Sequence, residues 1–412
     1  MKIRLITFIQ KEIVLCIAVL CAIISAFLIP PSKAYIDYID FRVLALLFCL
    51  MLVVAGFQTI GLFENIIEKM IKHISNTRQL AFALVLICFF TSMFITNDVA
   101  LITFVPFAIM TLQKIKKEKL MIFVIVMQTI AANLGSMFTP LGNPQNLYLY
   151  SISQMDILGF LRLMFPVTCL SFVLIAVTLL FMKNEKIGTL EKIGTLEEIG
   201  TLEEIGKLEE IGTLEEIGII EEIGAVEEKG TIDVSRSVNL DRVQMTAFIV
   251  LFAICLCTVL HMIDYRIAIV IVVITVLIFN RKLLAKADYL LLLTFVAFFI
   301  FVGNMKHMTC IANVLASVVS GNEIIVSTIA SQVISNVPAA ILLSGFTKNY
   351  SMLILGTNIG GLGTLIASMA SLISYKIYGK TEGARKGKYL AVFSVFNLIY
   401  LFIILTACII IV

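Results

Sequence analysis

Long uninterrupted apolar segments constrain this chain more than any other feature of its sequence. Leu390–Ile411 and Ile13–Ile29 contain almost only apolar residues, and about 18–20 such residues are enough to cross a lipid bilayer. The 412 residues are 60% hydrophobic, with a mean hydropathy of +1.04, whereas soluble domains contain about 45–50% apolar residues. The sequence therefore predicts an all-α polytopic membrane protein.

The sequence also lacks the signals of several other protein classes. It contains no HExxH, P-loop or GxSxG pattern, which would indicate a metalloprotease, an ATPase or a serine hydrolase. Its nine cysteines lie mostly inside apolar runs, where we expect reduced, buried side chains and no disulfide framework. We therefore expect no enzymatic activity, no cofactor and no nucleic-acid partner. The first apolar run is expected to be an uncleaved helix, the alternative being a signal peptide.

Basic residues indicate which loops face the cytoplasm. The N-terminus carries Lys2, Arg4 and Lys11, and the loop Gln113–Lys119 is strongly basic. Cytoplasmic loops of membrane proteins are enriched in Lys and Arg, and one assignment of the spans places every strongly basic loop on the same side. The sequence thus predicts a multi-pass plasma-membrane protein with a cytoplasmic N-terminus and about nine to eleven transmembrane helices.

An acidic repeat divides the apolar sequence into two halves. Residues 185–232 form eight hexads similar to EEIGTL, which hold 14 of the 28 acidic residues of the chain. A period of six fits neither a helix face nor a strand, and one glycine per hexad disfavours a long helix. The alternative is a left-handed β-helix, in which Glu-rich rungs would form a poor core. We interpret 183–240 as a cytoplasmic linker between a first membrane half, 1–182, and a second, 241–412.

The two membrane halves contain matching polar motifs. A polar tripeptide interrupts an apolar segment in each half, Thr96-Asn97-Asp98 in the first and Ser335-Asn336-Val337 in the second. The loop charges place five spans between these tripeptides, so the second copy should be inverted relative to the first. Downstream of the tripeptides, one alignment without gaps pairs Asn133 with Asn358, Gly135 with Gly360, Thr139 with Thr364, and Tyr150 with Tyr375.

The first tripeptide is expected to form the turn of a re-entrant hairpin. The window Cys88–Phe107 contains ten Leu, Ile, Val or Phe residues, which favour membrane insertion by roughly 3 to 6 kcal/mol. A central Asp costs about 2.5 to 3.5 kcal/mol, so the free energy of inserting the segment as one lipid-facing span is close to zero. A hairpin whose tip faces protein and water is favoured, because irregular backbone is tolerated there. We predict two such hairpins, one in each half.

The Gly-rich stretch that follows each hairpin is expected to be a broken helix. Pro140, Gly142 and Pro144 interrupt residues 120–150, which are too many for one untilted span, and we expect the break at Gly142–Asn143. Free carbonyls at such breaks coordinate cations, and half-helix N-termini attract anions. The alternative is that the polar side chains only hold helices together. The candidate binding residues are Thr96, Asn97, Asp98, Asn133, Thr139, Gly142, Asn143, Asn146, Ser335, Asn336, Asn358, Gly360, Thr364 and Ser368, with a Na+ site near Asn97, Asp98 and Gly142.

At these residues the sequence resembles the ion transporter superfamily, which includes divalent anion/sodium symporters, citrate transporters and arsenical pump membrane proteins. The TND and SNVPA tips and the LGNPQN motif are similar to symporter motifs, while FITNDVALITFVP and GTNIGGLGTLIASMASL look closer to the arsenical-pump branch. The resemblance implies an elevator-like carrier, often dimeric, with its sites between the hairpin tips and the broken helices. In the second half it implies a site formed by Ser335, Asn336 and a helix over Asn358–Thr364. The sequence departs from the symporters' paired Ser-Asn-Thr motifs at the third positions, Asp98 and Val337.

Together these features predict a secondary active transporter of small anions, either carboxylates or inorganic oxyanions, coupled to H+ or Na+. Asp98 would hold the coupling ion at the first hairpin tip. Three alternatives stay open: a metalloid efflux carrier that works with a separate ATPase subunit, a cation/proton antiporter, and a passive channel. The expected partners are a small anionic substrate, the lipid bilayer and a second copy of the chain.

Overall fold

The computed structural model describes residues 12–71, 74–187 and 242–411, which are almost entirely helical. This confirms the prediction of an all-α polytopic membrane protein. Eight helical segments within these ranges are long and apolar enough to cross a membrane. The eight are α4 (Phe41–Thr59), α6 (Thr77–Ile95), η1 with α8 (Glu118–Leu120 and Met121–Ser136), α10 (Ile157–Leu180), α13 (Arg242–Val259), α14 with η3 (Tyr265–Asn280 and Arg281–Lys286), α15 (Tyr289–His307) and α21 (Lys386–Ile411).

The same unit of a hairpin, a broken helix and a long helix occurs in both halves. In the first half, α6 and α7 (Asn97–Lys114) form the hairpin, α8 and α9 (Pro144–Ser153) form the broken helix, and α10 follows. The equivalent elements of the second half are α17 (Glu323–Ile334), α18 (Asn336–Ser344), α19 (Tyr350–Ile359), α20 (Met369–Gly379) and α21.

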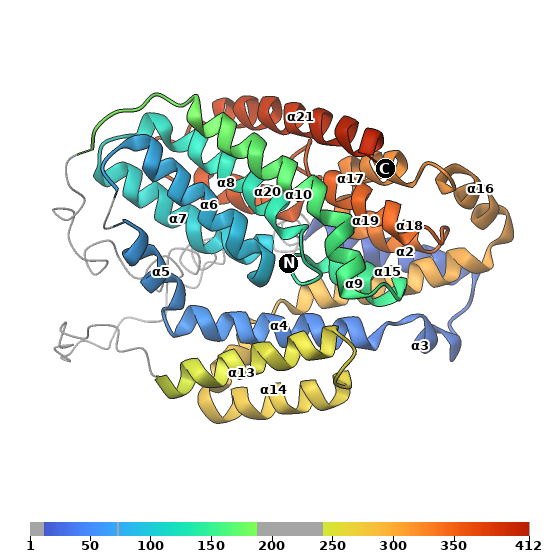
Figure 1. Ribbon diagram of the computed structural model, residues 1–412. Coiled ribbons are helices and arrows are strands. Elements are labelled where there is room, and N and C mark those ends of the chain that lie inside the picture. The colour runs from blue at the N-terminus through green and yellow to red at the C-terminus, as the bar shows by residue number, and fades with distance from the viewer. Residues whose placement is uncertain (1–11, 72–73, 188–241, 412) are drawn as a thin grey trace, which may run out of the picture.

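The two units approach each other from opposite ends. Figure 1 shows α6, α7 and α8 toward one end of the molecule, and α17, α18 and α19 toward the other. The second half of each broken helix crosses to the other unit, because α20 packs against α7 and α9 packs against α18. This reciprocal packing is the arrangement expected for the predicted inverted repeat, and it brings both hairpin tips and both helix breaks to the middle of the protein.

A second layer of helices lies along one side of the paired units. In it α4 packs against α13 and α14, and α2 (Ile13–Leu28) packs against α15; Figure 1 shows α4, α13 and α14 side by side. The layer meets the repeat units where α4 contacts α9 and α15 contacts α18. Three shorter helices connect these parts: α3 (Ala34–Tyr38), α5 (Leu62–Ile71) and α16 (Thr309–Val319).

Polar residues at the helix starts explain why the apolar segments begin where they do. An Asp or Asn side chain that precedes a helix accepts a hydrogen bond from a free backbone N–H of the first turn. Asp156, for example, accepts from the Gly159 N–H at 3.2 Å at the start of α10. The same kind of cap begins α4, α6, α9, α14, α15 and α19, at Asp40, Asn76, Asn143, Asp264, Asp288 and Asn349.

Most of the acidic repeat lies outside the described residues. Its interpretation as a linker therefore stays a prediction, and so does the division of the chain at 183–240. The first residues of the repeat are described up to Ile187, and they contact the base of the first hairpin.

Candidate functional site

Each hairpin turns at one residue with an unusual backbone conformation. Thr96 has φ 72° and ψ 150°, and Ser335 has φ 72° and ψ 155°. Glycine is almost the only residue that adopts this conformation, and a side chain there costs on the order of 1–3 kcal/mol. The surrounding structure must therefore hold both turns in place. The same strained turn at matched positions shows that the two tips are built alike.

The residue after each turn holds the tip against the neighbouring broken helix. The Asn97 N–H donates to the Gly142 carbonyl at 3.1 Å, and the Asn336 N–H donates to the Ala367 carbonyl at 2.9 Å. The alignment that pairs Asn133 with Asn358 also pairs Gly142 with Ala367. The predicted neighbourhood of Asn97, Asp98 and Gly142 is therefore present, and the second half reproduces it without the acid.

Both helix breaks are longer than the sequence analysis predicted. We expected the first break at Gly142–Asn143, but α8 already ends at Ser136, so residues 137–143 are non-helical. Similarly, residues 360–368 leave the helix after Ile359, although Asn358–Thr364 was expected to be helical. Close packing shapes the first break, since a Cβ added at Gly142 would lie 2.0 Å from the Ser136 carbonyl oxygen.

Buried side-chain amides connect the two halves at the centre. The Asn97 amide donates to Oδ1 of Asn133 at 3.0 Å. From the second half, the Ser368 hydroxyl donates to the same oxygen at 2.9 Å. The Asn133 amide in turn donates to the Ser371 hydroxyl at 3.4 Å. Asn133 thus joins its own hairpin tip to the start of α20 in the opposite half.

The second half repeats this connection in the opposite direction. Asn143 donates its amide to Oδ1 of Asn358 at 3.0 Å, and Asn358 donates to Oδ1 of Asn146 at 2.5 Å. In the alignment, Asn143 and Asn146 correspond to Ser368 and Ser371, the residues that contact Asn133. Each central asparagine therefore bonds to the start of the other half's second helix segment, as expected for helix-connecting polar residues.

The two candidate threonines hold the hairpins to the breaks. The Thr139 hydroxyl donates to the Met93 carbonyl, and the Thr364 hydroxyl donates to the Gln332 carbonyl at 3.0 Å. These are again equivalent contacts in the two halves. Both hydroxyl protons therefore connect a hairpin to a break, and the ligand role that the sequence suggested for the two oxygens stays a prediction. The candidate Gly360 lies in the same region, where an added Cβ would be 2.6 Å from the Ser331 hydroxyl oxygen.

The largest difference between the halves is one carboxylate. Asp98 lies in the first turn of α7, where the helix dipole favours a negative charge. Its Oδ1 is buried and has no hydrogen-bond partner among the described residues. The matched residue of the second half is Val337, so the two tips share a backbone design and differ in charge.

Gln332 is a functional candidate that the sequence analysis missed. Its amide donates to the carbonyls of Gly360 and Leu362, both at 2.9 Å, and its oxygen accepts from the Thr364 N–H at 2.8 Å. Gln332 thus replaces the backbone hydrogen bonds that the second break lacks. The matched residue in the first half is Met93. The only sequence signal was a glutamine inside an apolar helix, one turn before the tip.

We expect Gln332→Met to reduce the stability of the second half. The substitution introduces the residue of the first half and leaves three backbone groups of the break without their partner. One buried group without a hydrogen bond costs about 1–3 kcal/mol. The measurement is the midpoint of thermal unfolding in detergent, followed by circular dichroism. Val333→Met is the control, because Val333 is 70% exposed. Equal midpoints for the two variants would contradict the bonding role of Gln332.

Sequence comparisons agree with this architecture. A protein-family model described as citrate transporter matches residues 5–351. An uncharacterized transporter of Methanocaldococcus jannaschii is 27% identical over 387 residues, covering 92% of this chain and 91% of that protein. The inner membrane protein YbiR of Escherichia coli is 28% identical over 366 residues, covering 87% and 86% of the two chains. The mouse P protein is 30% identical over 148 residues, which are 34% of this chain and 17% of that protein.

The inverted pair of hairpins and broken helices, together with these relatives, defines a multi-pass membrane transporter. The chain belongs to the citrate transporter family, whose model covers most of its length. This confirms the resemblance to the ion transporter superfamily, of which the sequence analysis named the citrate transporters as one group.

Proposed function

We propose that this chain is a secondary active transporter of small anions in the plasma membrane, driven by H+ or Na+. The observation that carries the proposal is the pair of hairpin tips, which are alike in backbone and hydrogen bonding while the first alone bears a carboxylate, that of Asp98. Carboxylates such as citrate are the first substrates to examine, because the family model is described as a citrate transporter.

Asp98 is the proposed site of the coupling ion. A buried carboxylate oxygen without a hydrogen-bond partner is costly unless a proton or a cation neutralises it. No group of three His, Cys, Asp or Glu side chains suited to a metal occurs in the described parts of the chain. A sodium ion at Asp98 would therefore take its other ligands from backbone carbonyls and side-chain amides, which suit hard cations.

Helix N-termini at the centre are the proposed binding groups for the anion. No side-chain cap bond is made at the N-termini of α7, α18 and α20 by Thr96, Ser335 or Ser368. The start of α9, in contrast, is capped by Asn143. The Asn97 and Asn336 N–H groups already donate to carbonyls, so the anion would bind through the helix dipoles and the remaining N–H groups of these first turns. This supports anion binding without a basic side chain.

Alternating access is proposed to result from movement of one layer of the fold relative to the other. The paired repeat units form one body and the layer of α2, α4 and α13–α15 forms another, and the units would move as an elevator against that layer. Hydrogen bonds at both tips hold each hairpin to its broken helix, which supports movement of the units as one piece. A homodimer with cytoplasmic N-termini completes the proposal.

The experiment is uptake into liposomes that contain the purified protein. Radiolabelled citrate, malate, succinate, phosphate and sulfate are offered under an imposed Na+ or pH gradient. We expect at least one anion to accumulate above its external concentration, and only under one of the gradients. Sodium movement that needs no anion would indicate an antiporter, and conduction without accumulation would indicate a channel. Either result would overturn the proposal.

A further inference from the structure

The beginning of the acidic repeat forms an isolated antiparallel β-bridge with the base of the first hairpin. The Thr77 N–H donates to the Glu185 carbonyl at 2.9 Å, and the Ile187 N–H donates to the Ser75 carbonyl at 2.9 Å. Between them, Asn76 and Lys186 form an antiparallel bridge. We call Ser75–Thr77 together with Lys117 the hairpin foot. The chain that leaves α10 thus pairs with the residues that begin α6.

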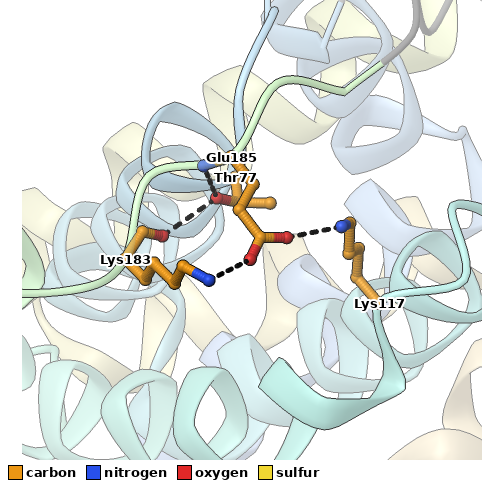
Figure 2. A network of polar contacts seen from close by, with 4 residues as sticks. All are labelled: Thr77, Lys117, Lys183 and Glu185. Atoms are coloured by element: carbon orange, nitrogen blue, oxygen red, sulfur yellow. Dashed lines mark hydrogen bonds and ion pairs between the residues drawn. The ribbon is translucent and has the colours of Figure 1, made fainter.

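Side chains of the repeat also contact the hairpin foot, as Figure 2 shows. The Glu185 carboxylate lies 2.5 Å from the Lys117 ammonium and 3.3 Å from that of Lys183. Its backbone N–H donates to the Thr77 hydroxyl at 3.0 Å. Ile187 packs against the apolar core. Because Lys117 follows α7 and Thr77 begins α6, Glu185 connects both arms of the hairpin.

The residues that make these side-chain contacts are the ones that the repeat reproduces. Glu185 and Ile187 are the first and third residues of their hexad. All eight hexads begin with Glu, and seven have Ile at the third position, whereas the second residue is Lys or Glu. The second hexad, Glu191–Leu196, has the same sequence as the first. The second hexad therefore carries the residues that contact Lys117 and the apolar core, although Thr189 stands where Lys183 precedes the first hexad.

We propose that the hairpin foot is a binding site for a Glu-x-Ile hexad, and that Glu191–Leu196 replaces the first hexad there when Glu185 is lost. The site recognises a carboxylate through Lys117 and an isoleucine two residues later through the adjoining apolar core. The backbone hydrogen bonds at Ser75 and Thr77 fix the register of the hexad in this site. The acidic repeat is then a set of interchangeable ligands for one site on the first hairpin.

The electrostatics of the foot favour exchange between hexads. Hydrogen bonds from Lys117 and Lys183 hold the pKa of Glu185 below its usual range, so the carboxylate is charged at neutral pH. The Lys117 and Glu185 side chains are nevertheless 31% and 38% exposed. Ion pairs this exposed are individually weak and are screened by salt. Further hexads on the same chain compete for the hairpin foot at high effective concentration. The entropic cost of closing the longer loop to a later hexad increases only slowly with loop length.

The test is carbodiimide coupling of the full-length protein, which joins a carboxylate to an amine in direct contact. Trypsin cleaves after Lys183, Lys186 and Lys192, so mass spectrometry separates products of Glu185 from those of Glu191. In the natural sequence we expect Lys117 to couple to Glu185. In Glu185→Ala we expect coupling of Lys117 to Glu191 to rise at least about fivefold.

Two controls distinguish register from general charge attraction. Glu197 and Glu198 are adjacent, but only Glu197 is the first residue of a hexad. The yield of Lys117 coupled to Glu197 should therefore be much higher than the yield of Lys117 coupled to Glu198. Adding Ile193→Asn to Glu185→Ala should remove coupling to Glu191. Equal coupling to the neighbouring glutamates, indifference to Ile193→Asn, or no Lys117–Glu185 product in the natural sequence would each overturn the proposal.

Discussion

Asp98→Asn is expected to eliminate accumulation of the anion against its gradient. Asparagine keeps the size of the side chain but removes the charge that attracts a proton or cation at the first tip. Under a tenfold gradient of one coupling ion, one-to-one coupling sustains an accumulation ratio of up to about ten, equivalent to about 1.4 kcal/mol. The variant should show a ratio of about one. The measurement is gradient-driven uptake in liposomes.

Val337→Asn is the matched control, because Val337 occupies the same place in the second tip. It introduces the same side chain but removes no charge, so ion-driven accumulation should persist. Binding of the anion to Asp98→Asn, measured as a thermal shift, should also persist if the carboxylate serves only the coupling ion. Full ion-driven accumulation by Asp98→Asn would show that another group carries the ion.

Gly135→Ala is expected to cause the second large effect, through packing. A Cβ at Gly135 would lie 2.0 Å from the Phe89 carbonyl oxygen and 2.8 Å from the Ser92 hydroxyl. Because the nearer atom is backbone, α6 and α8 must separate. Overpacking of this kind costs about 1–3 kcal/mol, and the displaced α8 carries Asn133. Thermal unfolding should begin at a lower temperature, and anion uptake should fall at least about tenfold, as for a misplaced binding group.

Two further glycines provide graded controls. At Gly360, the nearest atoms to an added Cβ belong to the Ser331 side chain, at 2.6 and 2.7 Å, so a rotation of that side chain relieves part of the clash. Gly360→Ala should therefore be milder than Gly135→Ala. Gly387→Ala should be neutral, since nothing lies within 4 Å of its added Cβ. Equal stability of all three variants would show that α6 and α8 do not depend on this close approach.

The hairpins and broken helices were predictable because polar residues are costly within apolar segments. Thr96-Asn97-Asp98 could not face lipid at low cost, and its counterpart at Ser335 identified the second copy. The extents of the breaks were not predictable from the local sequence. They depend on distant side chains. The Asn146 amide donates to the Met137 and Thr139 carbonyls, both at 3.1 Å, and the Gln332 amide donates to carbonyls of the second break.

The candidate site was predictable as a set of residues but not as an arrangement. The sequence identified Asn133, Asn143, Asn146 and Asn358 as ligands or as connecting residues, and could not decide between these roles. The structure places Asn143 and Asn146 against Asn358, and Asn133 against Ser368, across the two halves, and these pairings depend on the packing of the two units. Binding of substrate or ions by these residues remains a prediction.

The isolated carboxylate at the centre has an electrical consequence. The amide and hydroxyl groups of the two tips are neutral, and Asp98 adds a negative charge to the first tip. If the empty carrier crosses the membrane with Asp98 ionised, it moves a negative charge through the field, and each charge is worth about 2.3 kcal/mol per 100 mV. With one monovalent cation bound, the site crosses neutral. On the proposed mechanism, the return of the empty carrier is therefore the voltage-sensitive step, which recordings of transient current would detect.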